Sequence, residues 1–149
     1  MRSVKIVIPF FLFCLAACDK NTFNTKPSLK LKSVSTRDVI PANPSSSTPP
    51  LVLTFEYTDA EGDLAGARVG VQKIEPECAL SNFVDTLSYS ISQELPASRD
   101  QQADLQVIFT YFQIQPQCNF NDSANFRVWI TDRAGNVSDT AETGIIIIR

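Results

Sequence analysis

The feature that most constrains this chain is an alternation of apolar and polar residues with a period of two. Such alternation places one set of side chains on each face of an extended strand, whereas an amphipathic helix needs a period of 3.6. The alternating runs lie at 29–32, 51–57, 67–72, 87–91, 105–111 and 126–130, and a final run of β-branched residues lies at 145–148. No stretch has a convincing helical face, so the sequence predicts an all-β chain of about seven strands.

Turn-forming residues separate these runs, most clearly at Pro41–Pro50, Glu61–Asp63 and Ala134–Asn136. Seven short strands of this kind are typical of an immunoglobulin-like β-sandwich of the fibronectin III or cadherin-like type. We expect this domain to span residues 28–149. Pro41–Pro50 is interpreted as a loop that its prolines hold extended, and a docking motif for a proline-binding partner is the alternative.

The first residues of the chain have the pattern of an export signal. Arg2 and Lys5 form a short positive region, and the chain from Ile6 to Ala17 is almost entirely apolar. This apolar run is too short for a permanent transmembrane helix, which needs about twenty residues. The sequence therefore predicts a signal peptide over residues 1–17.

The run Leu15-Ala16-Ala17-Cys18 resembles the lipobox of bacterial lipoproteins at every position. The resemblance implies that the Cys18 thiol receives a diacylglyceryl group and that cleavage follows Ala17. Two or three acyl chains would then hold the protein firmly on a membrane. Residues 18–27 are interpreted as a flexible tether. The alternative is an ordinary secretory signal that happens to contain Cys18.

Taken together, the chain resembles Gram-negative bacterial lipoproteins that carry a single immunoglobulin-like or cadherin-like domain. Asp19 resembles the inner-membrane retention signal of enteric bacteria, whereas other Gram-negative groups send such lipoproteins to the outer surface. We expect a lipid anchor in the cell envelope, in the outer membrane rather than the inner one.

The chain has four cysteines, which we expect to have different roles. Cys14 leaves with the signal and Cys18 carries lipid. Cys78 and Cys118 remain in an oxidising compartment, where a pair of thiols is usually bridged. In an immunoglobulin-like topology both fall at the same end of the sandwich, which favours a disulfide, and two reduced core thiols are the alternative. The chain has no histidine, which argues against a zinc site.

At the other end of such a sandwich, two acidic loops are expected to meet. Their sequences, FEYTDAEGDL and WITDRAGNVSD, resemble loops of bacterial immunoglobulin-like and cadherin-like domains, some of which bind calcium. Carboxylate oxygens on loops are the ligands that Ca²⁺ prefers, so the candidate ligands are Asp59, Glu61, Asp63 and Asp132. Two alternatives stay open: these are turn residues, or Arg133 neutralises a carboxylate in place of a metal.

Three short Asp-Ser/Thr-apolar sequences resemble acceptors for O-glycosylation in some Gram-negative bacteria. The hydroxyl-bearing residues are Thr86, Ser123 and Thr140. The resemblance makes these three residues candidate modification sites.

The sequence points to a non-catalytic binding or structural module of the envelope. A net charge of −3 argues against nucleic acid as a partner, and the lack of histidine excludes a Ser-His-Asp triad. A carboxylate-dependent glycoside hydrolase would have to use Asp59 with Asp63 or Asp132. The other alternative is a calcium-stabilised surface adhesion or capture protein. The expected partners are the membrane, through Cys18, and an envelope or surface protein or glycan.

Overall fold

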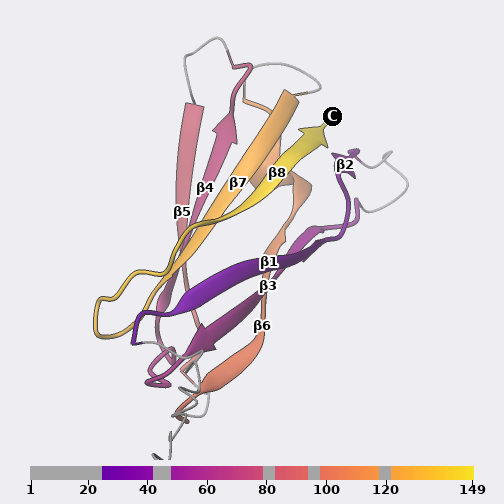
Figure 1. Ribbon diagram of the computed structural model, residues 1–149. Coiled ribbons are helices and arrows are strands. Elements are labelled where there is room, and N and C mark those ends of the chain that lie inside the picture. The colour runs from indigo at the N-terminus through magenta and orange to yellow at the C-terminus, as the bar shows by residue number, and fades with distance from the viewer. Residues whose placement is uncertain (1–24, 42–47, 79–82, 94–97, 118–121) are drawn as a thin grey trace, which may run out of the picture.

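The computed structural model describes residues 25–41, 48–78, 83–93, 98–117 and 122–149. Within them the chain forms eight strands and one short helix, α1 (Tyr111–Ile114). Figure 1 shows how the strands are arranged. The strands are β1 (Ser28–Val34), β2 (Asp38–Val39), β3 (Leu51–Asp59), β4 (Arg68–Glu75), β5 (Phe83–Ser90), β6 (Gln101–Phe109), β7 (Asp122–Thr131) and β8 (Ala141–Ile148).

The strands form two sheets, so the chain is an all-β sandwich. One sheet has the order β1-β3-β6 and the other the order β2-β8-β7-β4-β5. Neighbouring strands are antiparallel except β2, which pairs with β8 in parallel. Each of the six alternating runs and the final β-branched run corresponds to a strand, which confirms the all-β prediction.

Two local elements differ from the expectation. Strand β2 has two residues, too few for an alternation to be visible in the sequence. The fifth run was expected to continue to Tyr111, but β6 ends at Phe109 and Tyr111 begins α1. The side-chain oxygen of Gln113 accepts the backbone N–H of Thr110 at 2.8 Å, which stabilises this turn. The Tyr111 hydroxyl donates to the Arg149 carbonyl at 2.8 Å, so α1 is held against the end of β8.

The hydrophobic core lies between the two sheets. Along β3 every second residue is buried, and this inward face carries Leu51, Leu53, Phe55 and Tyr57. The rings of Phe109 and Phe126, from opposite sheets, stack with their centroids 5.3 Å apart. Alternation along the sequence therefore becomes a shared apolar layer, whose burial contributes about 25 cal/mol per Å² of apolar surface.

Strand β4 approaches β7 closely at Gly70. Gly70 lies opposite Trp129 in the ladder, and a Cβ at Gly70 would lie 2.2 Å from the indole ring. No larger residue fits there unless Trp129 moves. The inward face of β4 continues past Val71 to two charged residues, Lys73 and Glu75, which are both buried.

The final strand is buried on one face. Ile146 and Ile148 are fully buried, whereas Ile145 and Ile147 are exposed on the outer face of the sheet. Pairing with β2 occupies the outer edge of β8 at Ile147 and Ile148. Earlier on this edge, the Arg37 guanidinium donates to the carbonyls of Thr143 and Ile145, at 2.8 and 3.2 Å. This edge is therefore largely occupied within the chain.

The sandwich has two distinct ends. The acidic pole, defined by residues 59–63 and 131–136, includes the β3–β4 and β7–β8 loops (the lower end of Figure 1). The cysteine pole, defined by residues 73–78 and 111–117, includes the end of β4 and helix α1. In the part of the chain that is described, no helix has the length and apolar character needed to cross a membrane.

Candidate functional site

The two acidic loops meet, as the sequence predicts. One oxygen from each of Glu61, Asp63 and Asp132 lies within 4.8 Å of the other two. Glu61 is exposed, Asp63 is half-buried and Asp132 is buried, so the group runs from the surface into the protein. Glu61 and Asp63 follow a strand of the three-stranded sheet, while Asp132 follows a strand of the five-stranded sheet. The group therefore spans both layers of the sandwich.

Asp59, the fourth predicted ligand, lies beneath the β3–β4 loop and outside this group of three. Its side chain is fully buried. Its Oδ2 accepts the backbone N–H groups of Gly62 at 2.7 Å and of Asp63 at 3.2 Å, so it orders the loop that carries the other acids. Gly62 has a φ of +69°, and a Cβ there would lie 1.9 Å from the Ser98 carbonyl oxygen. Glycine is therefore required at this turn.

The electrostatics of Asp59 are unfavourable for a negative charge. Burial is the main cause that raises its pKa, and the carboxylates of Asp63 and Asp132 raise it further. The two backbone hydrogen bonds oppose this shift without cancelling it. Asp59 Oδ1 and Asp63 Oδ1 are buried and have no hydrogen-bond partner. Buried polar atoms of this kind are rare in folded proteins and call for an explanation.

Asp132 orders the second loop. Its Oδ1 accepts the backbone N–H of Asn136 at 2.7 Å, and its Oδ2 accepts the Asn136 side-chain amide at 2.8 Å. Gly135, at a φ of +92°, allows the chain to turn between them. Asp59 and Asp132 therefore do act as turn residues, as one alternative expected. Glu61 and Asp63 do not, because within the described residues their carboxylates accept no hydrogen bond.

Arg133 does not take the role of an internal counter-ion. Its side chain is exposed, and it forms no ion pair with any described carboxylate. The described ion pairs also leave out Asp59, Glu61, Asp63 and Asp132. The three clustered carboxylates and the buried Asp59 thus form no ion pair with a cation in the described part of the chain.

The chain enters the sandwich at this same pole. Ser28, the first residue of β1, pairs with Thr58, next to Asp59. Lys26 forms an ion pair with Asp139 at 2.6 Å, and the Asn136 amide reaches the Thr25 carbonyl at 3.4 Å. Cys18, the predicted lipidation site, lies outside the described residues.

The cysteine pole contains a buried ion pair that the sequence analysis missed. Lys73 Nζ contacts Glu75 Oε1, and both side chains are almost completely buried. Lys73 also donates to the Gln115 carbonyl at 3.0 Å, and the Gln117 N–H points to Glu75 Oε2 at 3.4 Å. The continuing alternation along β4 was the available signal, because it places residues 73 and 75 on the inward face.

Cys78 is buried beside this ion pair, and its N–H donates to the Glu75 carbonyl at 3.2 Å. Its predicted partner Cys118 lies outside the described residues, so the disulfide stays a prediction. Gln117, the residue before Cys118, contacts Glu75, three residues before Cys78. Both flanking segments therefore lie at one pole, as the disulfide requires.

None of the three candidate glycosylation sites belongs to the group of three carboxylates. Thr86 on β5 and Thr140 before β8 are exposed, whereas Ser123 on β7 is half-buried. Exposure makes Thr86 and Thr140 the more accessible acceptors. All three remain predictions.

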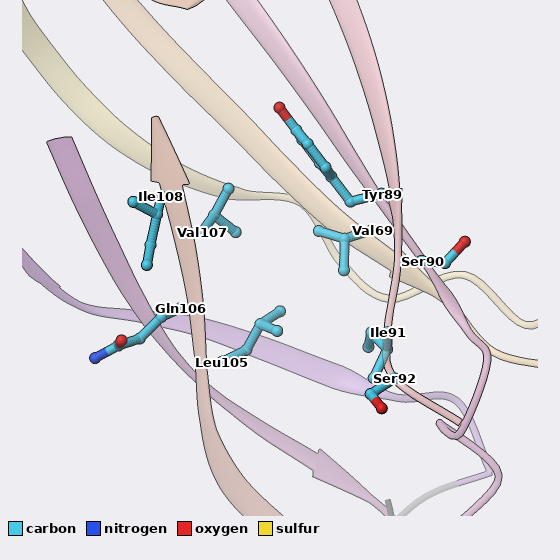
Figure 2. Close-up of a pocket in the computed structure, with 9 residues that line it drawn as sticks. All are labelled: Val69, Tyr89, Ser90, Ile91, Ser92, Leu105, Gln106, Val107 and Ile108. Atoms are coloured by element: carbon cyan, nitrogen blue, oxygen red, sulfur yellow. The ribbon is translucent and has the colours of Figure 1, made fainter. Parts of the chain in front are cut away.

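An apolar groove of about 260 Å³ lies between strands β5 and β6. Figure 2 shows Leu105 and Val107 of β6 pointing toward Val69, while Gln106 and Ile108 point away. These strands end their respective sheets, so the groove marks the open side of the sandwich. Its lining brings together no group of charged or catalytic side chains, and it is smaller than most small-molecule sites.

Comparison with known proteins finds no matching family model and no matching curated protein. The acidic pole therefore has to be interpreted from its own geometry.

Proposed function

We propose that this chain is a lipid-anchored, non-catalytic binding or structural module of a bacterial cell envelope, with an immunoglobulin-like sandwich as its domain. The observation that carries the proposal is the exposed entry of the chain at the acidic pole, next to Lys26 and Asp139. A tether from Cys18 to Thr25 would reach roughly 25 Å if extended. The domain would then stand close to the membrane with its cysteine pole outward.

The strand order supports the immunoglobulin-like assignment. Strands β1, β3 and β6 correspond to A, B and E of that fold, and β4, β7 and β8 correspond to C, F and G. Strand β5 pairs with β4, whereas the fourth strand of a constant-type domain joins the sheet of A, B and E. The arrangement thus favours the fibronectin III-like variant.

The burial of Asp59 supports a non-catalytic role. A glycoside hydrolase needs two carboxyl groups that flank the scissile bond of the substrate. Asp59 is fully buried and its Oδ2 is occupied by two backbone N–H groups, so it cannot contact a sugar. This leaves Asp63 and Asp132, and Asp132 already accepts two hydrogen bonds from Asn136.

The anchor is tested by metabolic labelling with a palmitate analogue in a Gram-negative host. We expect the wild-type chain to be labelled and to sediment with membranes, and Cys18→Ala to be unlabelled. Cys14→Ala is the matched control, because it removes a signal-peptide thiol and leaves the lipobox intact. Labelling of Cys18→Ala, or release of the wild-type chain as a free secreted protein, would refute the anchor.

The membrane and its face are tested by density-gradient separation and by protease treatment of intact cells. We expect the protein to sediment with the outer membrane. Cleavage on intact cells identifies a surface adhesion or capture protein, whereas protection identifies a periplasmic accessory module. Sedimentation with the inner membrane would contradict the proposed location.

A further inference from the structure

We propose that the open side of the sandwich binds an extended peptide segment of another protein, which pairs with the outer edge of β6 and fills the apolar groove between β5 and β6. The proposal names a class of partner for the binding module proposed above, and in that respect it rests on the proposed function. It does not depend on the lipid anchor, because it concerns only residues within the domain.

The edge strands of the two sheets differ in how well they resist pairing with another chain. An edge strand is a template for an added strand unless it is short, bulged or covered, or carries lysines or prolines. Strand β1 carries Lys30 and Lys32 and has a register shift between Leu31 and Ser33. Strand β2 has only two residues. The edges at β1 and β2 are therefore protected.

The edges at the open side lack this protection. Strands β5 and β6 have eight and nine residues, and their pairing with β4 and β3 shows no register shift. Neither strand contains a lysine, arginine, proline or glycine. No described strand pairs with the outer edge of β6 from Gln102 to Phe109. A partner strand can therefore pair with this edge along most of its length.

The groove determines what kind of partner fits. It is lined by the inward side chains Leu105 and Val107 of β6 and by Val69 and Tyr89 of the other sheet, as Figure 2 shows. Filling it requires side chains that enter between the two sheets. In a second folded copy, the inward side chains of β6 already pack against the core of that copy. A folded copy can thus extend the sheet but cannot fill the groove, whereas an extended segment can do both.

The partner segment should alternate apolar and polar side chains. Every second side chain of an extended strand points to the same face, so apolar residues at alternate positions would enter the groove. In this mode of recognition the backbone hydrogen bonds provide affinity and the alternate side chains provide specificity. No described residue that lines the groove is charged, and β5 and β6 each contain one aspartate and no basic residue. These charges favour a neutral or basic segment.

The strand order agrees with an added strand at β6. In a constant-type immunoglobulin domain, a fourth strand joins the sheet of A, B and E. With the assignment proposed above, β6 is strand E, while β5 pairs with β4 in the other sheet. A segment paired with β6 would take the position of that fourth strand.

The test uses a synthetic peptide as long as β6, which alternates valine and threonine and carries a lysine at each end. Fluorescence anisotropy of the labelled peptide measures its binding to the full chain in lipid nanodiscs, where no detergent can enter the groove, and empty nanodiscs correct for binding to lipid. We expect a Kd below about 1 mM. The same peptide N-methylated at its central residues keeps its side chains but loses backbone donors, and should bind at least about tenfold more weakly.

The absence of binding at about 1 mM, or equal binding of the two peptides, would overturn the proposal. Neither result changes the labelling of Cys18, which tests the anchor separately.

Two matched variants locate the site. Leu105 and Leu31 are half-buried leucines that lie opposite Phe55, at the two edges of the three-stranded sheet. Leu105→Lys places a charge in the groove and should weaken binding at least about tenfold, whereas Leu31→Lys places it at the other edge and should change the Kd by less than about twofold. Equal effects of the two variants would contradict the site. Circular dichroism checks their folding, and the methylated peptide keeps the test decisive if Leu105→Lys does not fold.

Discussion

The two poles of the sandwich differ in the charged groups that surround their buried carboxylates. At the cysteine pole, Glu75 is buried against Lys73, and the chain provides the counter-charge itself. At the acidic pole, Asp59 is equally buried but faces Asp63 and Asp132, with no described cation beside it. The comparison teaches that the described chain supplies a counter-charge to the buried carboxylate at one pole, whereas at the other pole the charged groups that act on the buried carboxylate are further carboxylates.

The largest expected effect comes from breaking the internal ion pair. Lys73→Met leaves Glu75 buried without a cation, and we expect a loss of about 3–5 kcal/mol in the free energy of unfolding, measured by urea denaturation. The double variant Lys73→Met/Glu75→Leu should recover most of this loss, because it removes both charges. A loss below about 1 kcal/mol would mean that Glu75 needs no counter-charge.

A second large effect is expected from the predicted disulfide at the same pole. Cys78→Ser combined with Cys118→Ser opens a loop of about forty residues and should cost roughly 2–4 kcal/mol, measured by urea denaturation. The wild-type chain in reducing buffer should show a similar loss. Alkylation of both thiols in the unreduced protein would refute the disulfide.

A feature of this structure could be predicted from the sequence when a repeating pattern of residues marks it, and not when it depends on a single contact. The alternation predicted six strands correctly, because burial of one face repeats every second residue, and the run of isoleucines at 145–148 predicted the last strand. It could not reveal β2, which has two residues, or α1, which depends on a local contact between Thr110 and Gln113. The meeting of Glu61, Asp63 and Asp132 was predictable once the strand directions were assumed.

The burial of charged residues was harder to predict. Asp59 was grouped with the metal ligands, but the structure places it under the loop, where it binds the backbone of Gly62 and Asp63. Lys73 and Glu75 were missed, although they lie in phase with Val69 and Val71. Charged side chains are almost always exposed unless paired, and the pairing depends on tertiary contacts that the sequence pattern does not contain.

A smaller effect is expected at the β7–β8 loop in calcium-free buffer. Asp132→Ala removes two acceptors for Asn136 and should lower the free energy of unfolding by about 1–2 kcal/mol. Asp139→Ala is the matched control on the same loop. It removes an exposed ion pair with Lys26 and should cost about 0–1 kcal/mol. Urea denaturation measures both, and a larger loss for Asp139→Ala would show that the loop depends on its surface rather than on Asp132.

The smallest expected effect concerns Glu142, an exposed carboxylate that serves as a reference for the buried carboxylates at the two poles. Hydrogen bonds from Asn125 and then from Arg127 hold the pKa of Glu142 below its usual value of 4.5. Because the pKa is lowered on folding, this contribution to stability is present above the unfolded pKa and is lost as pH falls through the folded one. An NMR titration should show the lowered pKa, and Asn125→Ala should return it toward 4.5. An unchanged pKa in the variant would contradict the assigned cause.

The most direct test of the contrast between the poles is an NMR titration of the Asp59 carboxyl group in the full chain in micelles. The account predicts a pKa above the usual value of 3.8, because burial disfavours the charged form and the carboxylates of Asp63 and Asp132 raise the pKa further. The variant Asp63→Asn should lower the pKa of Asp59 part of the way toward 3.8. A pKa of Asp59 at or below 3.8 in the wild-type chain would contradict the account.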